Sequence, residues 1–532
     1  MFEDRQLDIE CADAININQE NLKKILNDNR DTAIGKKFHF SEMKTAEEYR
    51  RNVPLCDYSD FQEYIEGMRE GKENLLTVYP LNGYCITSGT EGKSKYIPIT
   101  CETLLRYSDY AERYKKWIIG EPGQGKRLFV NTFRTDLDKE QEKGLLVSEV
   151  CYRWFYEKGE LDMERFAGGK ELLFDTRTTD HLYAKVWSGI LTEDIVLLES
   201  IFQYDILNFF DYFEKHWEEI IRDIENGEIP EDKELSASIR KRLLSFERKP
   251  KRLRFVEQEC RKGFDGIAKR IWPKLRLLSG ISNQAFFAED LALKRYTGEI
   301  PKHYFCYCSS ECYIGTPAEE NSFDFVLLPN NAFYEFLPYS ENDDVTETVL
   351  PHECEPDQLY EVIFTNFSGL YRYRMGDVLH MKGFRKESPV FEFAFRRNQA
   401  LNIAGEKISI RQLEKAVQEM EAASVQVEAY AFGASLEQMP ANYIALFVLK
   451  ENKAISRLAD ILDAALSNVN RDYMELRSLG QLGKPAVYLA DRDEYQEIME
   501  SFRAEHRHNK PLHILPEGIL GVLSERSVYE AT

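Results

Sequence analysis

Residues 82–100, NGYCITSGTEGKSKYIPIT, join an apolar, aromatic run to a loop of small and basic residues. Gly89 and Gly92 let the backbone approach a ligand, and the N–H groups of such a loop can form an anion-binding nest. The spacing is not that of a Walker A loop. The segment predicts either a phosphate-binding loop or a surface hairpin turn. The polar side chains available to a phosphate are those of Ser88, Thr90, Lys93 and Lys95.

The chain of 532 residues is too long for one ordinary core, so we expect at least two domains. The pattern changes after Arg397, where helical and strand-like segments alternate over about 130 residues, a usual domain size. We therefore expect a larger domain over residues 1–396 and a small α+β domain over 397–532. In the small domain the periodicity predicts helices at 408–420 and 457–473 and strands at 425–433 and 442–449.

The sequence of the larger domain, residues 1–396, predicts an α/β fold with mixed sheets and packed helices. We expect turns at Ser368-Gly369 and Gly376-Asp377 between antiparallel strands in 360–384. The basic run 238–255 predicts a solvated helical face or an interdomain arm. Other expected helices are 18–27, 45–51, 58–71 and 201–226, and other expected strands are 274–280, 303–310 and 323–330.

The balance of charge limits the classes of partner. The formal net charge is −22, with 69 Lys and Arg against 91 Asp and Glu. Such a surface repels nucleic-acid backbones and anionic lipids, although a nucleotide needs only a few well-placed donors. No apolar run reaches the roughly 20 residues that cross a bilayer, and the acidic N-terminus is unlike a secretory signal. With ten scattered cysteines, we expect a cytoplasmic protein that binds neither nucleic acid nor membrane.

Three motifs occur in a characteristic order. TSGTEGKSK (87–95) resembles the phosphate loop of the adenylate-forming superfamily, YCSSE (307–311) its aromatic-x-x-Ser/Thr-Glu motif, and YRYRMGD (371–377) its motif ending in Gly-Asp. Longer stretches resemble the auxin-responsive acyl-acid amido synthetases (the Gretchen Hagen family) from about residue 31 to about residue 515. These stretches are GKKFHFSEMKTAEEYRRNVPLCDYSDFQEYIEGM (35–68), LNFFDYFEKHWEEIIRDI (207–224), SSECYIG (309–315), LLPNNAFYEFLP (327–338), FTNFSGLYRYRMGDVL (364–379) and RRNQALNIAGEK (396–407).

The resemblance implies a role for each matching residue. Tyr307 would lie against adenine, with Ser309 and Ser310 nearby, and Glu311 would bind Mg²⁺. Asp377 would accept hydrogen bonds from the ribose hydroxyls. The ATP phosphates would be held by Ser88, Gly89, Thr90 and Lys93. The remaining implied contacts are Arg396 and Lys407 to phosphate or ribose, and Lys510 to the reacting carboxylate and the α-phosphate.

The chemistry of these residue types agrees with the implied reaction. A carboxylate that attacks an α-phosphate meets another anion, so cations and backbone donors should dominate the site. The resemblance implies a mobile small domain that closes to keep water from the acyl adenylate. We therefore expect an ATP-dependent ligase that adenylates a small carboxylic acid, releases pyrophosphate and transfers the acyl group to the amine of an amino acid. The alternatives are an acyl-CoA ligase and a non-catalytic homologue that binds a nucleotide or an acid.

The cysteine-rich segment admits another interpretation. Cys306, Cys308 and Cys312, with His303 and the more distant Cys354 and His352, resemble a zinc site in composition. Their spacing does not match the usual ligand pairs, so buried free thiols are the favoured interpretation. Two positions depart from the family pattern. Cys308 stands where many relatives carry alanine or glycine, and Glu91 stands where Thr or Ser is common.

Overall fold

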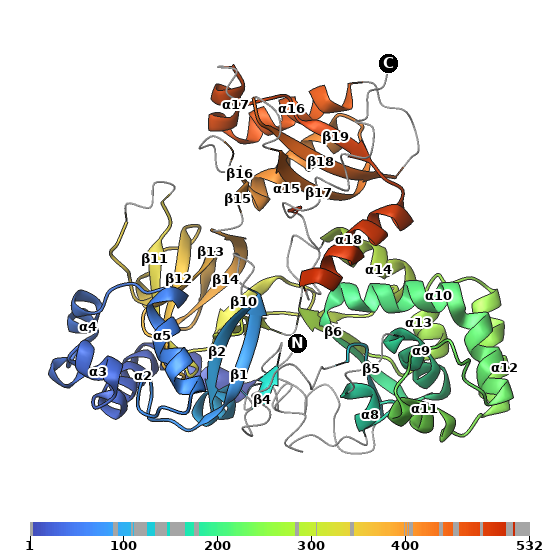
Figure 1. The fold of residues 1–532 in the computed structure, drawn as a ribbon, viewed down its shortest axis with the longest axis horizontal. Coiled ribbons are helices and arrows are strands. Elements are labelled where there is room, and N and C mark those ends of the chain that lie inside the picture. Colours follow the sequence, from blue (N-terminus) through green and yellow to red (C-terminus); the bar gives the residue numbers. More distant parts are fainter. Residues whose placement is uncertain are drawn as a thin grey trace. The chain divides into compact units, whose positions relative to one another are not determined.

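The chain divides into two compact units, one formed by residues 1–375 and 379–393 and one by residues 376–378 and 394–532 (Figure 1). Both combine helices with sheets, so the expected α/β class, with a large N-terminal and a smaller C-terminal part, is confirmed. No helix in the described ranges is long and apolar enough to span a membrane. The computed structural model describes residues 4–88, 94–107, 110, 125–132, 146–148, 165–174, 180–281, 287–304, 306–340, 345–397, 400–401, 403, 408–435, 440–450, 457–478, 482–506 and 514–515.

The first unit begins with short helices whose ends are capped by side chains. Thr45 and Glu48 form a capping box at the start of α4, and Asp57 and Asp60 form one at the start of α5. Each box satisfies backbone N–H groups that the first helical turn leaves unpaired. The helices expected at 18–27, 45–51 and 58–71 are therefore confirmed, within α2, α4 and α5. The bounds are α1 Arg5–Ala12, α2 Ala14–Asn29, α3 Ala33–Lys37, η1 Phe40–Glu42, α4 Ala46–Asn52 and α5 Tyr58–Arg69.

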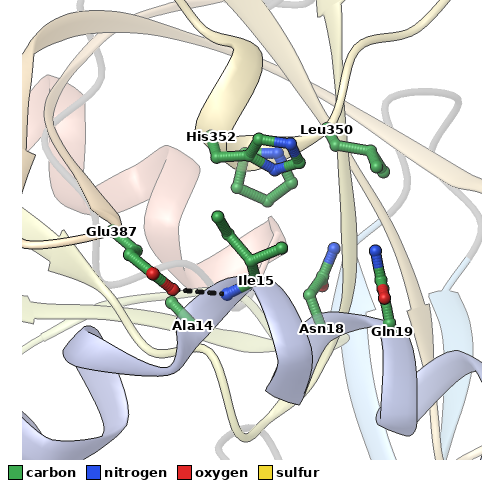
Figure 2. A pocket seen from close by; sticks show the side chains of 8 residues that line it. Ala14, Ile15, Asn18, Gln19, Leu350, His352 and Glu387 are labelled. Atoms are coloured by element: carbon green, nitrogen blue, oxygen red, sulfur yellow. Dashed lines mark hydrogen bonds between the residues drawn. The ribbon is translucent and has the colours of Figure 1, made fainter.

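Helix α2 is capped by a residue far along the chain. Its own N-cap residue, Asp13, makes no side-chain capping bond. Instead, Glu387 Oε2 accepts a hydrogen bond from the Ile15 N–H at 3.2 Å, beside a small hollow that His352 also lines (Figure 2). A carboxylate at this position also interacts favourably with the helix dipole. Glu387 thus ties the turn between β13 (Tyr373–Arg385) and β14 (Ser388–Arg396) to the N-terminal helices.

The N-terminal helices are held by residues about three hundred positions later. Asn18 and Tyr334 exchange two hydrogen bonds, at 3.0 Å and 2.7 Å, between the amide side chain and the backbone. The Asn21 amide donates to the backbone oxygens of Pro329 and Ala332 at 2.9 Å and 3.0 Å. Helix α2 therefore packs on β11 (Ala332–Pro338) and on the turn before it.

A seven-stranded sheet lies beside these helices, in the order β11-β12-β13-β14-β10-β9-β8. The turn expected at Ser368-Gly369 is confirmed, because Gly369 has φ +93° and a Cβ there would lie 2.6 Å from Leu76 Cβ. The turn expected at Gly376-Asp377 is wrong, because β13 continues through it. Gly376 has φ +86°, which glycine adopts as an irregularity within a strand. The other bounds are β8 Tyr307–Cys308, β9 Tyr313–Pro317, β10 Asp324–Leu327, β12 Leu359–Asn366, β13 Tyr373–Arg385 and β14 Ser388–Arg396.

The rest of the first unit is built on a parallel sheet, β3-β5-β6-β7, packed against helices. The helix expected from 201 begins only at Gln203, because residues 201–202 complete β5. The basic run 238–255 forms helices, as expected, but its arginines are not all solvated: Arg252 is buried and donates to Ile190 O at 2.9 Å. The bounds are β3 Lys126–Phe129, α8 Lys170–Leu173, α9 His181–Leu191, β5 Ile195–Phe202, α10 Gln203–Asn226, α11 Ala237–Leu244, α12 Pro250–Arg261, α13 Ile267–Ile271, β6 Leu277–Ile281, α14 Phe287–Thr297 and β7 Lys302–His303.

The second unit is an α+β arrangement with its own core. The strands expected at 425–433 and 442–449 and the helix expected at 408–420 are confirmed. The helix expected at 457–473 is broken at Asn470, whose side-chain oxygen accepts from Tyr473 N at 2.8 Å and starts a new helix. The bounds are β15 Ala400–Leu401, β16 Ile408–Ser409, α15 Ile410–Ala422, β17 Val427–Ser435, β18 Asn442–Leu449, α16 Leu458–Val469, α17 Arg471–Ser478, β19 Ala486–Leu489 and α18 Arg492–His506.

Candidate active site

A tight turn after β8 presents Glu311. The Ser309 hydroxyl accepts hydrogen bonds from the backbone N–H groups of Glu311 and Cys312, both at 3.2 Å, and Ser309 N donates to Cys312 O at 2.9 Å. Serine favours such turns because its hydroxyl can replace a backbone acceptor. The turn fixes the backbone on both sides of Glu311. Ser309 and Ser310 are partly exposed, whereas Glu311 is only 9% exposed.

Three residues from distant segments hold Glu311 in place. The Tyr373 hydroxyl donates to Glu311 Oε1 at 3.2 Å. The Asn366 amide donates to Glu311 O at 2.9 Å, and the Tyr107 hydroxyl donates to the same oxygen at 3.4 Å. Burial, and then the charge of Glu311, raise the pKa of Tyr373 well above its usual value, so that this hydroxyl stays a donor. The structure therefore presents a buried carboxylate in one fixed orientation.

Sequence reasoning missed Tyr107, Asn366 and Tyr373 as parts of this site. Asn366 and Tyr373 lie inside segments that carried the family resemblance, but only the final Asp377 of YRYRMGD was given a role. A signal for Tyr373 was the alternation of Tyr and Arg from Tyr371 to Arg374, because side chains two positions apart along a strand face the same side. Tyr371 and Tyr373 are buried, and the Tyr371 hydroxyl donates to Leu76 O at 2.7 Å.

The two arginines of this motif fix the backbone on either side of Tyr373. Arg372 donates from Nε and Nη2 to the two carboxylate oxygens of Glu335 at 3.1 Å and 2.8 Å, and both side chains are buried. Arg374 donates in the same way to Glu361 at 3.0 Å and 2.7 Å. Such bidentate pairs set both distance and direction. Arg372 holds a positive φ of 46°, a conformation that its buried contacts stabilise.

A second pair of predicted residues lies in the second unit. The Arg396 guanidinium donates from Nε to Asp377 Oδ1, and Asp377 is 3% exposed. The Arg397 N–H donates to Gly376 O at 2.7 Å, so the backbone beside Asp377 is held as well. The structure thus brings Asp377 and Arg396 together as an ion pair. Lys407 and Lys510 lie outside the described residues.

The predicted phosphate loop connects β1 (Leu81–Ser88) and β2 (Ser94–Thr100), which pair in antiparallel fashion with Ser88 opposite Ser94. A third strand, β4 (Leu146–Ser148), pairs parallel with β1. The residues on either side of the predicted loop are therefore held together by strand pairing. Gly89, Thr90 and Lys93 lie outside the described residues.

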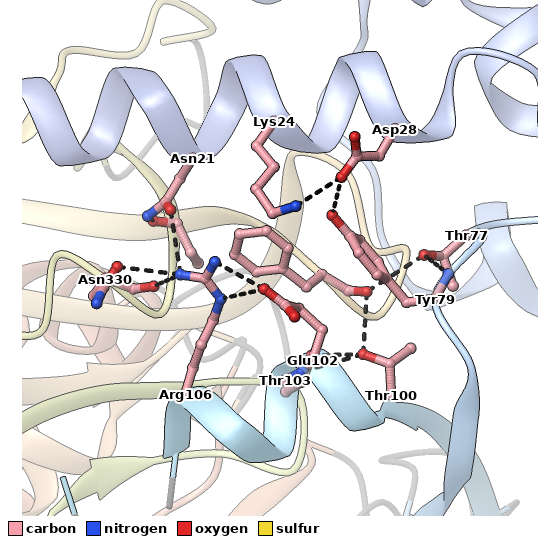
Figure 3. Close-up of polar contacts among 12 residues, drawn as sticks. Asn21, Lys24, Asp28, Thr77, Tyr79, Thr100, Glu102, Thr103, Arg106 and Asn330 are labelled. Atoms are coloured by element: carbon pink, nitrogen blue, oxygen red, sulfur yellow. Dashed lines mark hydrogen bonds and ion pairs between the residues drawn. The ribbon is translucent and has the colours of Figure 1, made fainter. Parts of the chain in front are cut away.

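A polar network anchors the segment that follows β2 (Figure 3). Arg106 donates to Glu102, to Asn330 and to the Asn21 side chain on α2, and its guanidinium stacks 3.8 Å from the centre of the Phe367 ring. The Thr100 hydroxyl donates to Phe367 O at 3.2 Å. These contacts join the end of β2 and the residues after it to Phe367, which follows the Asn366 that holds Glu311.

Tyr307 lies in an aromatic cluster. Its ring centre is 5.4 Å from that of Phe391, 5.9 Å from Phe325 and 6.1 Å from Phe393, and the residue is 9% exposed. The cysteines around it are free thiols, with Cys306 and Cys312 buried and Cys308 partly exposed. Across the described ranges, no three His, Cys, Asp or Glu side chains gather into a potential metal site.

Comparison with known proteins finds relatives and solved structures that are similar to nearly the whole chain. It is 26% identical to the jasmonoyl–L-amino acid synthetase GH3.5 of Oryza sativa subsp. japonica, over 92% of this chain and 90% of the relative. The solved structure of the AtGH3.15 acyl acid amido synthetase in complex with 2,4-DB matches 98% of this chain and 95% of its own, with a TM-score of 0.84 and 23% identity. A 2-hydroxyisobutyryl-CoA ligase in the postadenylation state shares the fold more distantly, with a TM-score of 0.51 and 11% identity over 98% of this chain and 90% of the ligase.

Family models match most of the chain in three consecutive parts. The GH3 family N-terminal domain matches residues 4–302, the GH3 family central domain matches 325–396, and the GH3 family C-terminal domain matches 411–514. The first match alone spans more than half of the 532 residues. The chain therefore belongs to the GH3 family.

Proposed function

We propose that this chain is an ATP-dependent acyl-acid amido synthetase. It adenylates a small carboxylic acid with release of pyrophosphate, and then transfers the acyl group to the amine of an amino acid. The observation that carries the proposal is the buried, oriented Glu311 carboxylate, held by Tyr373 and Asn366. Membership of the GH3 family and the printed names of its relatives support the same activity.

The residues around Glu311 suit a Mg²⁺ ion. Magnesium prefers hard oxygen ligands and is commonly held by one or two carboxylates together with substrate phosphates. Glu311 offers such a carboxylate, and Tyr373 orients it from one side. When bound, the ion would offset negative charge on the phosphates.

The other implied residues complete the proposed nucleotide site. Tyr307 would contact adenine and Asp377 the ribose, with the Asp377 carboxylate oriented by Arg396. Ser88, Gly89, Thr90 and Lys93 would cradle the phosphates, and Lys407 would contact phosphate or ribose. Lys510 would reach the reacting carboxylate and α-phosphate, where positive charge offsets the repulsion between two anions. Residues 1–396 would carry ATP and the acid, and residues 397–532 would act as a mobile lid.

The test is pyrophosphate release by the purified protein with MgATP, across a panel of carboxylic acids, with and without mixed amino acids. We expect acid-dependent release that turns over repeatedly only with amino acids, and an amide product plus AMP by mass spectrometry. Glu311→Gln and Lys510→Ala should abolish release. Turnover with coenzyme A instead of amino acids would make the protein an acyl-CoA ligase. A protein that binds ATP and an acid but releases no pyrophosphate would be a non-catalytic homologue.

A further inference from the structure

Two free thiols flank Tyr307 and lie in contact with each other. The Sγ atoms of Cys306 and Cys308 are 3.3 Å apart. Cys306 immediately precedes β8, and Cys308 is the last residue of this strand. The pairing with β9 is also irregular here, since Tyr307 pairs with Gly315 but Cys308 pairs with Tyr313. Such irregularities bend a strand locally.

The distance between the Cys306 and Cys308 sulfur atoms is little longer than a disulfide bond. A disulfide joins two sulfur atoms at about 2.05 Å, so these atoms need to approach by roughly 1.2 Å. Cys308 is partly exposed and accessible to a reagent, whereas Cys306 is 2% exposed and accessible mainly to Cys308. An exposed attacking thiol beside a protected second thiol is the arrangement that thiol–disulfide exchange requires.

We propose that Cys306 and Cys308 form a dithiol site that a low-molecular-weight disulfide, such as glutathione disulfide, oxidises to an intramolecular disulfide, and that this bond weakens ATP binding at Tyr307. The thiolate of Cys308 attacks the glutathione disulfide, and one glutathione leaves as its thiolate. The thiolate of Cys306 then attacks Cys308 Sγ in the mixed disulfide, and the second glutathione leaves. The two cysteines are oxidised, the glutathione disulfide is reduced to two glutathiones, and the two thiol protons pass to them.

The bond acts on Tyr307 because it closes a small ring that contains the Tyr307 backbone. Closing this ring changes the backbone torsions of Tyr307 and hence the direction of its side chain. The Tyr307 ring packs among Phe325, Phe391 and Phe393, so it cannot turn freely to restore its former position. This half of the proposal rests on the proposed role of Tyr307 in binding adenine.

Cys312 does not compete as a partner in this chemistry. It is fully buried, and its Sγ lies 3.6 Å from the Tyr334 hydroxyl. A reagent in solution therefore cannot reach this thiol directly.

The experiment compares the full-length protein after reduction with dithiothreitol and after equilibration with glutathione disulfide. Peptide mapping by mass spectrometry locates the disulfide, and calorimetric titration measures the Kd for MgATP. We expect a Cys306–Cys308 disulfide, a Kd raised about tenfold, which is roughly 1.4 kcal/mol, and recovery on reduction. Cys308→Ala should keep the reduced Kd under both conditions, because it lacks one of the two thiols that the bond needs. Cys101→Ala, which removes another partly exposed thiol, should respond like the unmodified chain.

Each other outcome overturns part of the inference. Glutathione that stays attached to Cys308, or no reaction at all, refutes the dithiol site. A mapped Cys306–Cys308 disulfide with an unchanged Kd refutes its effect on ATP. Reduced protein that binds no ATP refutes the proposed function and this effect together, while the peptide map still decides the thiol chemistry.

Discussion

At the scale of single residues, the site depends on neutral hydroxyl and amide groups that orient Glu311 through hydrogen bonds. Glu311 is oriented by Tyr373 at its side chain and by Asn366 at its backbone. None of these contacts can be read from the sequence, because Glu311 and Tyr373 are 62 positions apart and only the packing of their strands brings them together. The motif itself was recognisable from the sequence, but the geometry that makes Tyr373 part of it was not.

The Tyr373→Phe substitution tests this orientation. It removes one hydrogen bond to a charged group, which contributes about 1.5–3 kcal/mol. We expect kcat/KM for MgATP in pyrophosphate release to fall roughly 10- to 100-fold. Tyr371→Phe is the matched control, since its hydroxyl bonds to Leu76 O and not to Glu311. Equal losses of activity in both variants would contradict the proposed role of Tyr373.

The burial of Lys185 predicts how the stability of the fold depends on pH. It is buried, and its Nζ donates to Asn131 O at 2.8 Å and to Leu172 O at 2.6 Å. Burial lowers the pKa of Lys185 from 10.5 to about 7. Between about pH 7 and 10.5 the unfolded chain therefore binds a proton that the folded chain does not, so this group makes stability rise with pH. Below pH 7 the folded protein carries the full cost of burying the charge.

The Lys185→Met substitution should remove that dependence. Between pH 7 and pH 9.5, the free energy of unfolding of the unmodified protein should rise relative to that of the Lys185→Met variant by on the order of a few kcal/mol. Urea unfolding at a series of pH values measures the difference. A difference between the two proteins that stays constant with pH would contradict a lowered pKa at Lys185.

At the scale of elements, local signals predicted helices better than the ends of strands. The capping boxes at Thr45 and Asp57 mark helix starts that the sequence shows directly. The break at Asn470 and the continuation of β13 through Gly376 were not predicted. Both residues are of types that favour turns, but Asn470 caps a second helix and Gly376 forms an irregularity within a strand. Tertiary packing decides between such uses.

The capping of α2 by Glu387 can be tested by comparing two carboxylates. Glu387→Ala removes the hydrogen bond to Ile15 N and should lower the free energy of unfolding by about 1 kcal/mol. Asp13→Ala should have a smaller effect, because Asp13 occupies the N-cap position but makes no capping bond. Thermal unfolding followed by circular dichroism measures both. A larger loss for Asp13→Ala would show that the distant cap is not the one that stabilises α2.

At the scale of the whole molecule, each of the two units has its own hydrophobic core. The first contains the clusters around Tyr334 and around Trp272, and the second contains a cluster around Phe432. Length and the change of pattern near Arg397 were enough to predict two parts and their class. The order of strands in the sheets was not predictable, because it depends on pairings between distant segments.

Separate cores predict that unfolding is not a single two-state transition. Leu466→Ala, in the core of the second unit, should destabilise one calorimetric transition by about 2–5 kcal/mol. Leu198→Ala, at a fully buried position in β5 of the first unit, should destabilise a different transition by a similar amount. A single transition that both substitutions shift equally would contradict this independence.

The distant contacts of the N-terminal helices also set the order of events during synthesis. Asn18 and its partner Tyr334 are 316 positions apart. At about 5–20 residues per second, a ribosome needs roughly 15 to 60 s to add that length. During this interval α2 exists without β11, with its apolar face open to other nascent chains and to chaperones. A chain released before β11 is made would keep that face exposed, so we expect early termination products to aggregate rather than to persist as folded fragments.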